Sequence, residues 1–561
     1  MPSHRSESKV GPTDQAAARM LKRSFRKMAV NPAISFLLPF LLVFIGRLVL
    51  LREVPPPEPL VQDEFSYLLA GETFASFRLT NPPHPLWEHF ETIHELMQPT
   101  YMSKYPPMQG LFLAAGQLVF GSPWLGVLLS MALFCGLLPW VFRAWLPCGW
   151  ALVGALLATD KIGVMSYWTD SYWGGGAAAV GGALALGSVK RLSLAPTPGM
   201  AAVFVLGGGI LANSRPYEGL VFMVASVGYL AWKWFGSKKW RVTWPEYLRR
   251  CAPAACLVAL PIILAMGFYN YRVTGKPTEF PYQTFERQYS IWSPFVWQQE
   301  PAPEPVYRHD FIRREWVDWD GAHKAYERKH WWWMRGVNFV RIIDFYFGLA
   351  FVLGGFLFIP ALWLGAKNRS IFGLMAFFYG GTLVLSDIVP HYTAPAAALI
   401  YLGVTAALRT TWFFAPGGIP AGKALVLLVL TIFLLATSAL RTDPENRFLF
   451  TKSNWMEKRH QVLAILERQP GLQLVFVYHG PQHDPNEVWT FNKPEIDASR
   501  IVWVDSMTPV ENQKVLDYYG RKRTVWMLDD DAELTLRPYA NPTAQPLLEM
   551  KNPPLEPPLA P

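Results

Sequence analysis

The sequence has few charged side chains for its length. Asp, Glu, Lys and Arg make up 17% of its 561 residues, whereas soluble domains have about 25%. Hydrophobic residues account for 51%. Apolar runs of about 20 residues recur along the chain, which is the length that a helix needs to cross a bilayer. This pattern predicts a helical membrane protein, and runs this long and continuous exclude a membrane β-barrel.

Cysteine is also scarce. The four cysteines, Cys135, Cys148, Cys251 and Cys256, lie in or at the edge of apolar runs. None pairs with another in an outer loop, and none has the spacing of metal ligands. We therefore predict neither a disulfide framework nor cysteine chemistry.

The basic excess has a simpler explanation than a nucleic-acid partner. The formal charge is +9, and Lys and Arg gather in alternate loops, such as 190–191, 238–241 and 367–369. The short loops on the other side hold only Lys161 and Arg215. This bias places the N-terminus in the cytoplasm. We predict no nucleic-acid partner.

We predict about eleven membrane-spanning helices, at 33–51, 121–142, 148–166, 173–189, 198–213, 217–235, 252–270, 342–365, 371–388, 392–408 and 422–440. The first run lacks a small-x-small cleavage site, so it is expected to remain as an uncleaved span. The run 108–119 is too short to cross and is expected to be an interfacial helix on the outer face. An odd number of spans puts the C-terminus outside.

The fold class that follows is an all-α polytopic membrane protein with a small C-terminal α/β domain. The segments are a basic cytoplasmic N-terminus (1–32), a transmembrane domain (33–440) with outer loops 52–107 and 271–340, an extracytoplasmic domain (441–545) and a disordered Pro-rich tail (546–561). In the third of these, the strand-like runs LQLVFVYHG, IVWVDSM and RTVWMLDDD are accompanied by a helical stretch. Strand, helix, strand order suggests a parallel sheet.

Two adjacent acids, Asp63 and Glu64, follow the first span by about a dozen residues. A solvated helix N-terminus would explain them, because the helix dipole favours acids there. However, Tyr67 and Ala70 share a helical face with Asp63, and the same loop ends in Lys104-Tyr105-Pro106-Pro107. A cation and a rigid turn at the membrane surface suit a lipid-linked phosphate.

These motifs and the order of spans together resemble the GT-C glycosyltransferases, over roughly 33–410. This family includes the protein O-mannosyltransferases and the aminoarabinose transferases of lipid A. The resemblance implies a polyprenyl-phosphate sugar donor in the membrane lipid and a hydroxyl-bearing acceptor, which could be a glycan, a lipid or a protein. It also implies transfer on the periplasmic face of a bacterial inner membrane.

The resemblance further implies catalytic roles for both acids. Asp63 would be the general base that deprotonates the acceptor hydroxyl, and Glu64 would orient acceptor or donor hydroxyls. A single displacement at the anomeric carbon would invert its configuration through an oxocarbenium-like state. Because the leaving group is a phosphate, developing charge needs fixed cations rather than an acid.

Candidates for holding the donor phosphate lie in several outer segments. They are Lys104 with Tyr105, Arg215 in a short outer loop, and His391-Tyr392 at another short turn. Arg215 can bind phosphate bidentately, although snorkelling or pairing with Glu218 would also explain it. In the family, a cation–Tyr pair at the matching turn helps to hold the donor phosphate.

Tyr67, Asp170 and Glu218 complete the predicted site as substrate-binding residues. Asp170 lies at the outer end of the third span, where the family also has an acid. The aromatic side chains beside it could stack on a sugar, but an interfacial Trp/Tyr belt explains most of them better.

The loop 81–98 carries His84, His89 and His94 among several glutamates, so a divalent metal is an alternative. No HExxH-type pair is present, and the resemblance requires no metal. We therefore favour a surface helix that shapes the acceptor groove over a divalent-metal site, which stays the alternative. In the loop 271–340, the tryptophans, Trp316 among them, could stack on an acceptor sugar or anchor a second surface helix to the membrane, and we favour anchoring.

A membrane transporter or lipid flippase is the alternative function. Charges on facing spans and an internal repeat would favour it, and the sequence shows neither. A non-catalytic scaffold whose tail binds a partner is a third hypothesis, but it leaves the acid pair and the Lys-Tyr-Pro-Pro turn unexplained.

Overall fold

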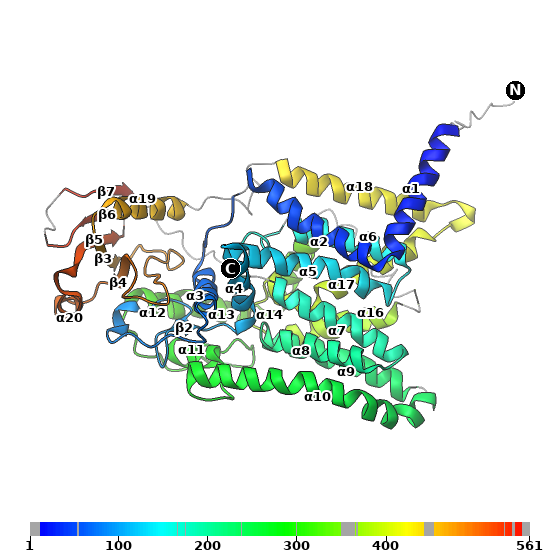
Figure 1. The fold of residues 1–561 in the computed structure, drawn as a ribbon, viewed down its shortest axis with the longest axis horizontal. Helices are drawn as coiled ribbons and strands as arrows, with labels where there is room; N and C mark the ends of the chain where they lie inside the picture. The colour runs from blue at the N-terminus through cyan, green and yellow to red at the C-terminus, as the bar shows by residue number, and fades with distance from the viewer. Residues whose placement is uncertain are drawn as a thin grey trace.

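The structure, a computed structural model, describes residues 12–52, 55–164, 166–173, 175–236, 238–298, 300–348, 365, 368–442, 454–531, 533–540 and 545–551. Its helices run roughly along the long axis, and a small sheet domain lies beyond one end of them (Figure 1). Helix α1 (Pro12–Val30) lies at the opposite end.

The helices of the bundle each overlap a predicted span, although α14 overlaps its span only over residues 342–347. They are α2 (Pro32–Val49), α5 (Pro123–Arg143), α6 (Cys148–Ala158), α7 (Gly176–Leu194), α8 (Pro198–Ala212), α9 (Pro216–Phe235), α10 (Lys238–Thr274), α14 (Trp331–Phe347), α16 (Arg369–Thr382), α17 (Ala397–Trp412) and α18 (Ala421–Thr442). Residues 349–364, in the predicted eighth span, lie outside the described residues. Within the described residues, four segments are long and apolar enough to cross a membrane, namely Pro32–Arg52, Pro123–Arg143, Pro245–Thr274 and Pro390–Trp412. The count of eleven stays a prediction.

Local sequence explains where several of these helices begin. Proline occupies the first turn of α2, α5, α8 and α9, where its missing N–H costs nothing. The side chain of Asn31 caps α2, and that of Thr197 caps α8. α5 is mostly buried at the centre of the bundle, whereas few residues are buried in the segment Pro245–Thr274 of α10. This contrast is expected where lipid replaces water around the outer helices.

One glycine positions the turn that carries His391. A Cβ on Gly182 in α7 would lie 1.9 Å from the carbonyl oxygen of Pro395. Pro395 belongs to the 3-10 helix η5 (Pro390–Ala396). Only glycine therefore allows η5 to pack this closely against α7.

The outer region between α2 and α5 holds α3 (Gln62–Ala75), the 3-10 turn η2 (Trp87–Phe90), the strands β1 (Glu95–Leu96) and β2 (Met102–Ser103), and α4 (Pro107–Phe120). α4 corresponds to the predicted interfacial helix. The prediction of a surface helix within 81–98 is wrong, because the four-residue turn η2 is the only helical element in that segment. Pro82, Pro83 and Pro85 explain this difference, since proline is poorly tolerated inside a helix.

The second outer region contains α11 (Pro281–Tyr289), α12 (Asp310–Arg313), the π-helical turn η4 (Arg314–Trp319) and α13 (Asp320–Lys329). The last three form a continuous helical stretch where a surface helix was predicted.

The C-terminal domain is a five-stranded sheet in the order β4-β3-β5-β6-β7, with α19 (Asn454–Arg468) and α20 (Pro509–Tyr519). The predicted strands are β3 (Leu472–His479), β4 (Ile501–Asp505) and β5 (Arg523–Asp530), and β3 pairs in parallel with both others. β6 (Glu533–Pro538) and β7 (Leu548–Lys551) add antiparallel pairs. β7 corrects the expectation of disorder for 548–551, while 552–561 lie outside the described residues.

The sheet domain packs against the outer loops of the membrane part. The Tyr101 hydroxyl donates to the carbonyl of Asn492 at 2.7 Å, and His89 Nδ1 lies 3.0 Å from the carbonyl oxygen of Asp505. Tyr101 and Leu69 share one apolar cluster with residues of β3 and β4. The domain therefore supports the loops from which the candidate site is built.

Candidate active site

Asp63 lies in the first turn of α3 and meets the end of the same outer loop. The Tyr105 hydroxyl donates to Asp63 Oδ1, and His94 Nε2 lies 3.5 Å from the same oxygen. The Asp63 side chain remains 22% exposed, so it can still reach a substrate. Burial raises the pKa of Asp63, and the charges of Lys104 and Arg215 oppose this rise. The acid is thus held in place beside two cations.

Lys104 is enclosed by aromatic rings. Its Nζ lies 4.7 Å from the ring centroid of Phe285, 5.2 Å from Trp316 and 5.3 Å from Tyr105. The residue is only 8% exposed, and burial lowers the pKa of Lys104. A cation held by ring faces keeps its N–H groups for a stronger acceptor such as phosphate.

Tyr67 packs on Tyr105 and lies within electrostatic reach of Arg215. Its ring stacks on that of Tyr105, with centroids 4.3 Å apart. The Arg215 guanidinium carbon lies 4.5 Å from the centroid of Tyr392. Burial raises the pKa of Tyr67 to about 12, with the Arg215 charge opposing it. Glu218 is buried in the first turn of α9, and Arg215 is the N-cap residue of that helix. The structure thus brings Tyr67, Arg215, Glu218 and Tyr392 together.

His391 is buried in η5 among aromatic residues. Its Nδ1 lies 2.9 Å from the Tyr167 hydroxyl, and its ring centroid is 4.8 Å from that of Trp173. Tyr392 follows it and contacts Arg215. Tyr392 therefore links η5 to Arg215. The polar contact of His391 itself is with Tyr167, in the loop 166–173 that also carries Asp170.

Glu64 has a different environment from Asp63. Its Oε1 accepts the N–H of Tyr172 at 2.8 Å, and its Oε2 accepts the N–H of Leu60 at 2.7 Å. The residue is 2% exposed, and burial raises the pKa of Glu64 to about 7 against the effect of these N–H groups. This geometry favours a positioning role, in which Glu64 joins α3 to the loop 166–173.

We expect Glu64→Gln to lower the free energy of unfolding by about 1–3 kcal/mol, because an amide offers only one oxygen to the two backbone N–H groups. Thermal unfolding of the purified protein in detergent measures this loss. Glu467→Gln, at an exposed position on α19, should change stability by no more than about 0.5 kcal/mol. Equal stabilities of wild type and Glu64→Gln would contradict the positioning role.

Asp170 is buried in an ion pair with Arg47 of α2. The guanidinium carbon of Arg47 also lies 6.0 Å from the Trp124 ring centroid, and the Trp124 indole N–H donates to the carbonyl of Thr169 at 2.8 Å. Burial raises the pKa of Asp170 to about 7, although Arg47 opposes the rise. This contact ties the loop 166–173 to α2 and gives Asp170 a structural partner, while its substrate role stays a prediction.

The three histidines weighed as metal ligands are not brought together. His84 Nε2 lies 3.3 Å from Asp497 Oδ1, and His89 contacts the backbone of Asp505. His94 instead lies beside Asp63. His84 and His89 therefore belong to the contact with the sheet domain, and His94 belongs to the candidate site.

The site also contains residues that the sequence analysis did not assign to it. Glu315 accepts a hydrogen bond from Gln62 at 3.1 Å, and burial, followed by the charges of Asp320 and Asp63, raises its pKa to about 8. Trp316 is 3% exposed and encloses Lys104, so the expectation that it anchors the membrane surface is wrong. Trp332 and Trp333 are exposed, as an anchoring role requires. The only feature of the sequence that could have assigned Glu315 and Trp316 to the site is the mixed charge of the segment 309–330.

Comparisons with known proteins give only structural matches. No family model and no curated protein matches the sequence. ArnT from Cupriavidus metallidurans bound to undecaprenyl phosphate is 12% identical, with a TM-score of 0.48 over 92% of this chain and 97% of that chain. Its apo form has a TM-score of 0.49 at 12% identity, over 93% and 98%.

An oligosaccharyltransferase of Archaeoglobus fulgidus, tethered with an acceptor peptide that contains the NVT sequon, is 10% identical with a TM-score of 0.48. The match covers 85% of this chain and 64% of that chain. The chain is similar in structure to these proteins over most of its length. At these identities, the similarity concerns the fold alone and does not extend to substrates or to the roles of residues.

Proposed function

We propose that this chain is a membrane glycosyltransferase that moves one sugar from a polyprenyl-phosphate donor to a hydroxyl acceptor. The observation that carries the proposal is the grouping of Asp63, Lys104 and Arg215. Asp63 and Lys104 come from opposite ends of one predicted outer loop and Arg215 from another, and both cations influence the pKa of the acid. A fixed carboxylate beside two cations suits a reaction that takes a proton from one substrate and releases a phosphate from the other.

The proposed reaction is a single displacement. The acceptor oxygen attacks the anomeric carbon, its proton passes to Asp63, and the bond between that carbon and the phosphate oxygen breaks. The released polyprenyl phosphate keeps the bonding electrons, and Lys104 and Arg215 stabilise its added charge. One displacement inverts the anomeric configuration. Tyr105, which donates to Asp63, and Glu64, which fixes the start of α3, hold the base in position.

The proposed orientation places the site on the periplasmic side of a bacterial inner membrane. The positive-inside distribution of Lys and Arg supports it. The position of α1 and the sheet domain at opposite ends of the bundle (Figure 1) agrees with it.

Binding of the lipid phosphate tests the proposal. Purified full-length protein is titrated with a short-chain polyprenyl phosphate and with the matching polyprenol, which lacks the phosphate. We expect much tighter binding of the phosphate, because both cations require an anion. Equal affinities for the two lipids would contradict a phosphate-binding site.

Arg215→Ala should weaken binding of the polyprenyl phosphate by about 10–150-fold, which corresponds to about 1.5–3 kcal/mol for a hydrogen bond to a charged group. Its binding of polyprenol should not change. Arg287→Ala is the matched control, because Arg287 is an exposed outer-loop arginine paired with Glu279. Unchanged phosphate affinity in Arg215→Ala would remove Arg215 from the donor site.

A further inference from the structure

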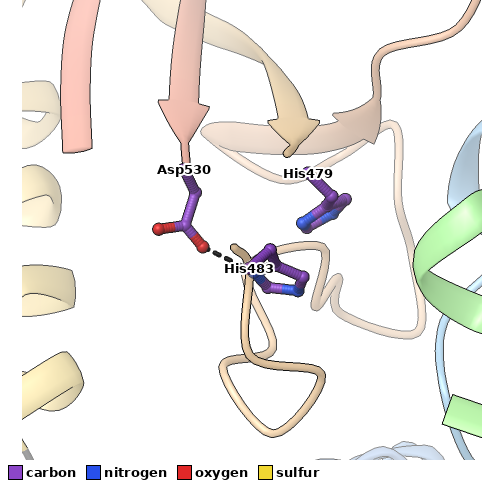
Figure 2. Close-up of side chains that lie close together, drawn as sticks. All are labelled: His479, His483 and Asp530. Atoms are coloured by element: carbon purple, nitrogen blue, oxygen red, sulfur yellow. Dashed lines mark hydrogen bonds and ion pairs between the residues drawn. The ribbon is translucent and has the colours of Figure 1, made fainter. Parts of the chain in front are cut away.

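A compact group of metal-ligating side chains lies in the C-terminal domain, apart from the candidate active site. His479 ends β3, and Asp530 ends the neighbouring parallel strand β5, where the two residues are register partners. His483 lies in the loop after β3 and points toward Asp530 (Figure 2). One nitrogen of each ring and one oxygen of Asp530 lie within 4.8 Å of one another. Carboxyl ends of parallel strands are a common place for ligands.

Carboxylates fix the orientation of both rings. His483 Nδ1 lies 2.6 Å from Asp530 Oδ2, and His479 Nε2 lies 3.0 Å from Asp505 Oδ1. Because a carboxylate only accepts, Nε2 of His479 carries the hydrogen, and Nδ1 of the neutral ring is a lone pair. This Nδ1 is buried and has no hydrogen-bond partner within the described part of the chain. Metal-binding histidines typically donate their other N–H to a carboxylate in this way.

A small cavity adjoins the two histidines. Its volume is about 10 Å³, and it is lined by His479, His483, Thr92, Phe311 and Glu487, while Asp530 lies outside its lining. That volume is close to the space of one water-sized sphere. Asp530 is 1% exposed, His483 is 2% exposed, and the Trp489 indole N–H donates to Asp530 Oδ2 at 2.7 Å. The Asp530 carboxylate is thus fixed by hydrogen bonds to its Oδ2 from His483 and Trp489.

We propose that His479, His483 and Asp530 form a binding site for a divalent transition-metal ion, with Zn²⁺ as the best match to two imidazoles and a carboxylate. Zn²⁺ takes nitrogen and oxygen ligands at about 2.0–2.2 Å. The ion replaces the hydrogen now shared by His483 and Asp530, and the lone pair of His479 completes the three protein ligands. Asp505 orients His479, and Trp489 orients Asp530.

The site lies where the sheet domain meets the outer loops. The Phe311 ring centroid is 4.2 Å from that of His479 and 5.8 Å from that of His483. Thr92 and Ile93, which follow η2, also line the cavity. A bound ion therefore fixes the loop after β3 against two segments near the candidate active site. One precedes His94, which lies beside Asp63, and the other precedes Trp316, which lies beside Lys104. The proposed role of the ion is structural.

A second cluster, His323, Glu327 and Asp387, supplies the control. Glu327 already forms an ion pair with Arg335, and His323 is 44% exposed on its side chain. The full-length protein is stripped with a chelator, supplied with ZnCl₂, dialysed, and its zinc content is measured by mass spectrometry. We expect about one ion per chain in the wild type and in His323→Gln, and loss of that ion in His483→Gln and in Asp530→Asn.

The X-ray absorption spectrum of the zinc-loaded wild type provides a readout that does not depend on the variants folding. Scattering from two imidazole rings supports the site. A wild type that retains no zinc, a spectrum without imidazole scattering, or equal zinc retention in the wild type and both ligand variants overturns it. Any of these three results would mean that His479, His483 and Asp530 only form hydrogen bonds that support the edge of the sheet.

Discussion

Asp63→Asn is expected to slow sugar transfer by about 10²–10⁴-fold, which is the usual contribution of a general base. Asparagine has nearly the same shape as aspartate and can still accept the hydrogen bond from Tyr105. It cannot take a proton from the acceptor hydroxyl. The loss should therefore appear in kcat, with the affinity for the polyprenyl-phosphate donor retained. Initial rates of lipid-phosphate release measure it.

Glu72→Gln is the matched control for this variant. Glu72 lies on the same helix and is also shifted to a higher pKa by burial, but it lines a cavity between α3 and the sheet domain. Its replacement should leave the rate near that of the wild type. Wild-type turnover by Asp63→Asn, or equal losses in both variants, would contradict a base role for Asp63.

Breaking the Arg47–Asp170 pair is expected to cost about 3–5 kcal/mol, because either single replacement removes the ion-pair partner of a buried charge. Both side chains are nearly fully buried, so water cannot replace the missing partner. Arg47→Met and Asp170→Asn should each lower the unfolding midpoint strongly. The double replacement should recover much of the loss, since neither charge then remains.

Thermal unfolding in one detergent compares these variants directly. Lys514→Met breaks an exposed pair with Glu511, and it should cost no more than about 1 kcal/mol. If Asp170 contacts a sugar instead of supporting the loop, Asp170→Asn will bind the donor more weakly without losing stability. That result would restore the substrate role implied by the sequence resemblance.

The positions of the helices could be predicted because an apolar run and its flanking charges are local properties. The gathering of Asp63, Lys104 and Arg215 could also be anticipated, since it requires only that their loops lie on one side of the membrane. The sequence gives no comparable signal for Glu64, whose partners are two backbone N–H groups.

Asp170 was harder to interpret because its partner, Arg47, lies within an apolar run more than a hundred residues earlier. The strands β6 and β7 were missed for a different reason. Their antiparallel pairing completes the sheet, but both segments are short and the last lies beside a Pro-rich end. Short strands show too few alternations for periodicity to identify them.

Turnover of a lipid-linked sugar tests the central claim most directly. Wild-type protein and Asp63→Asn are reconstituted side by side in liposomes with a panel of polyprenyl-phosphate sugars and hydroxyl acceptors. Release of polyprenyl phosphate is then followed by mass spectrometry. The account predicts acceptor-dependent release by the wild type with at least one donor, and almost none by Asp63→Asn. No release by the wild type from any donor, or the same release by both proteins, would contradict it.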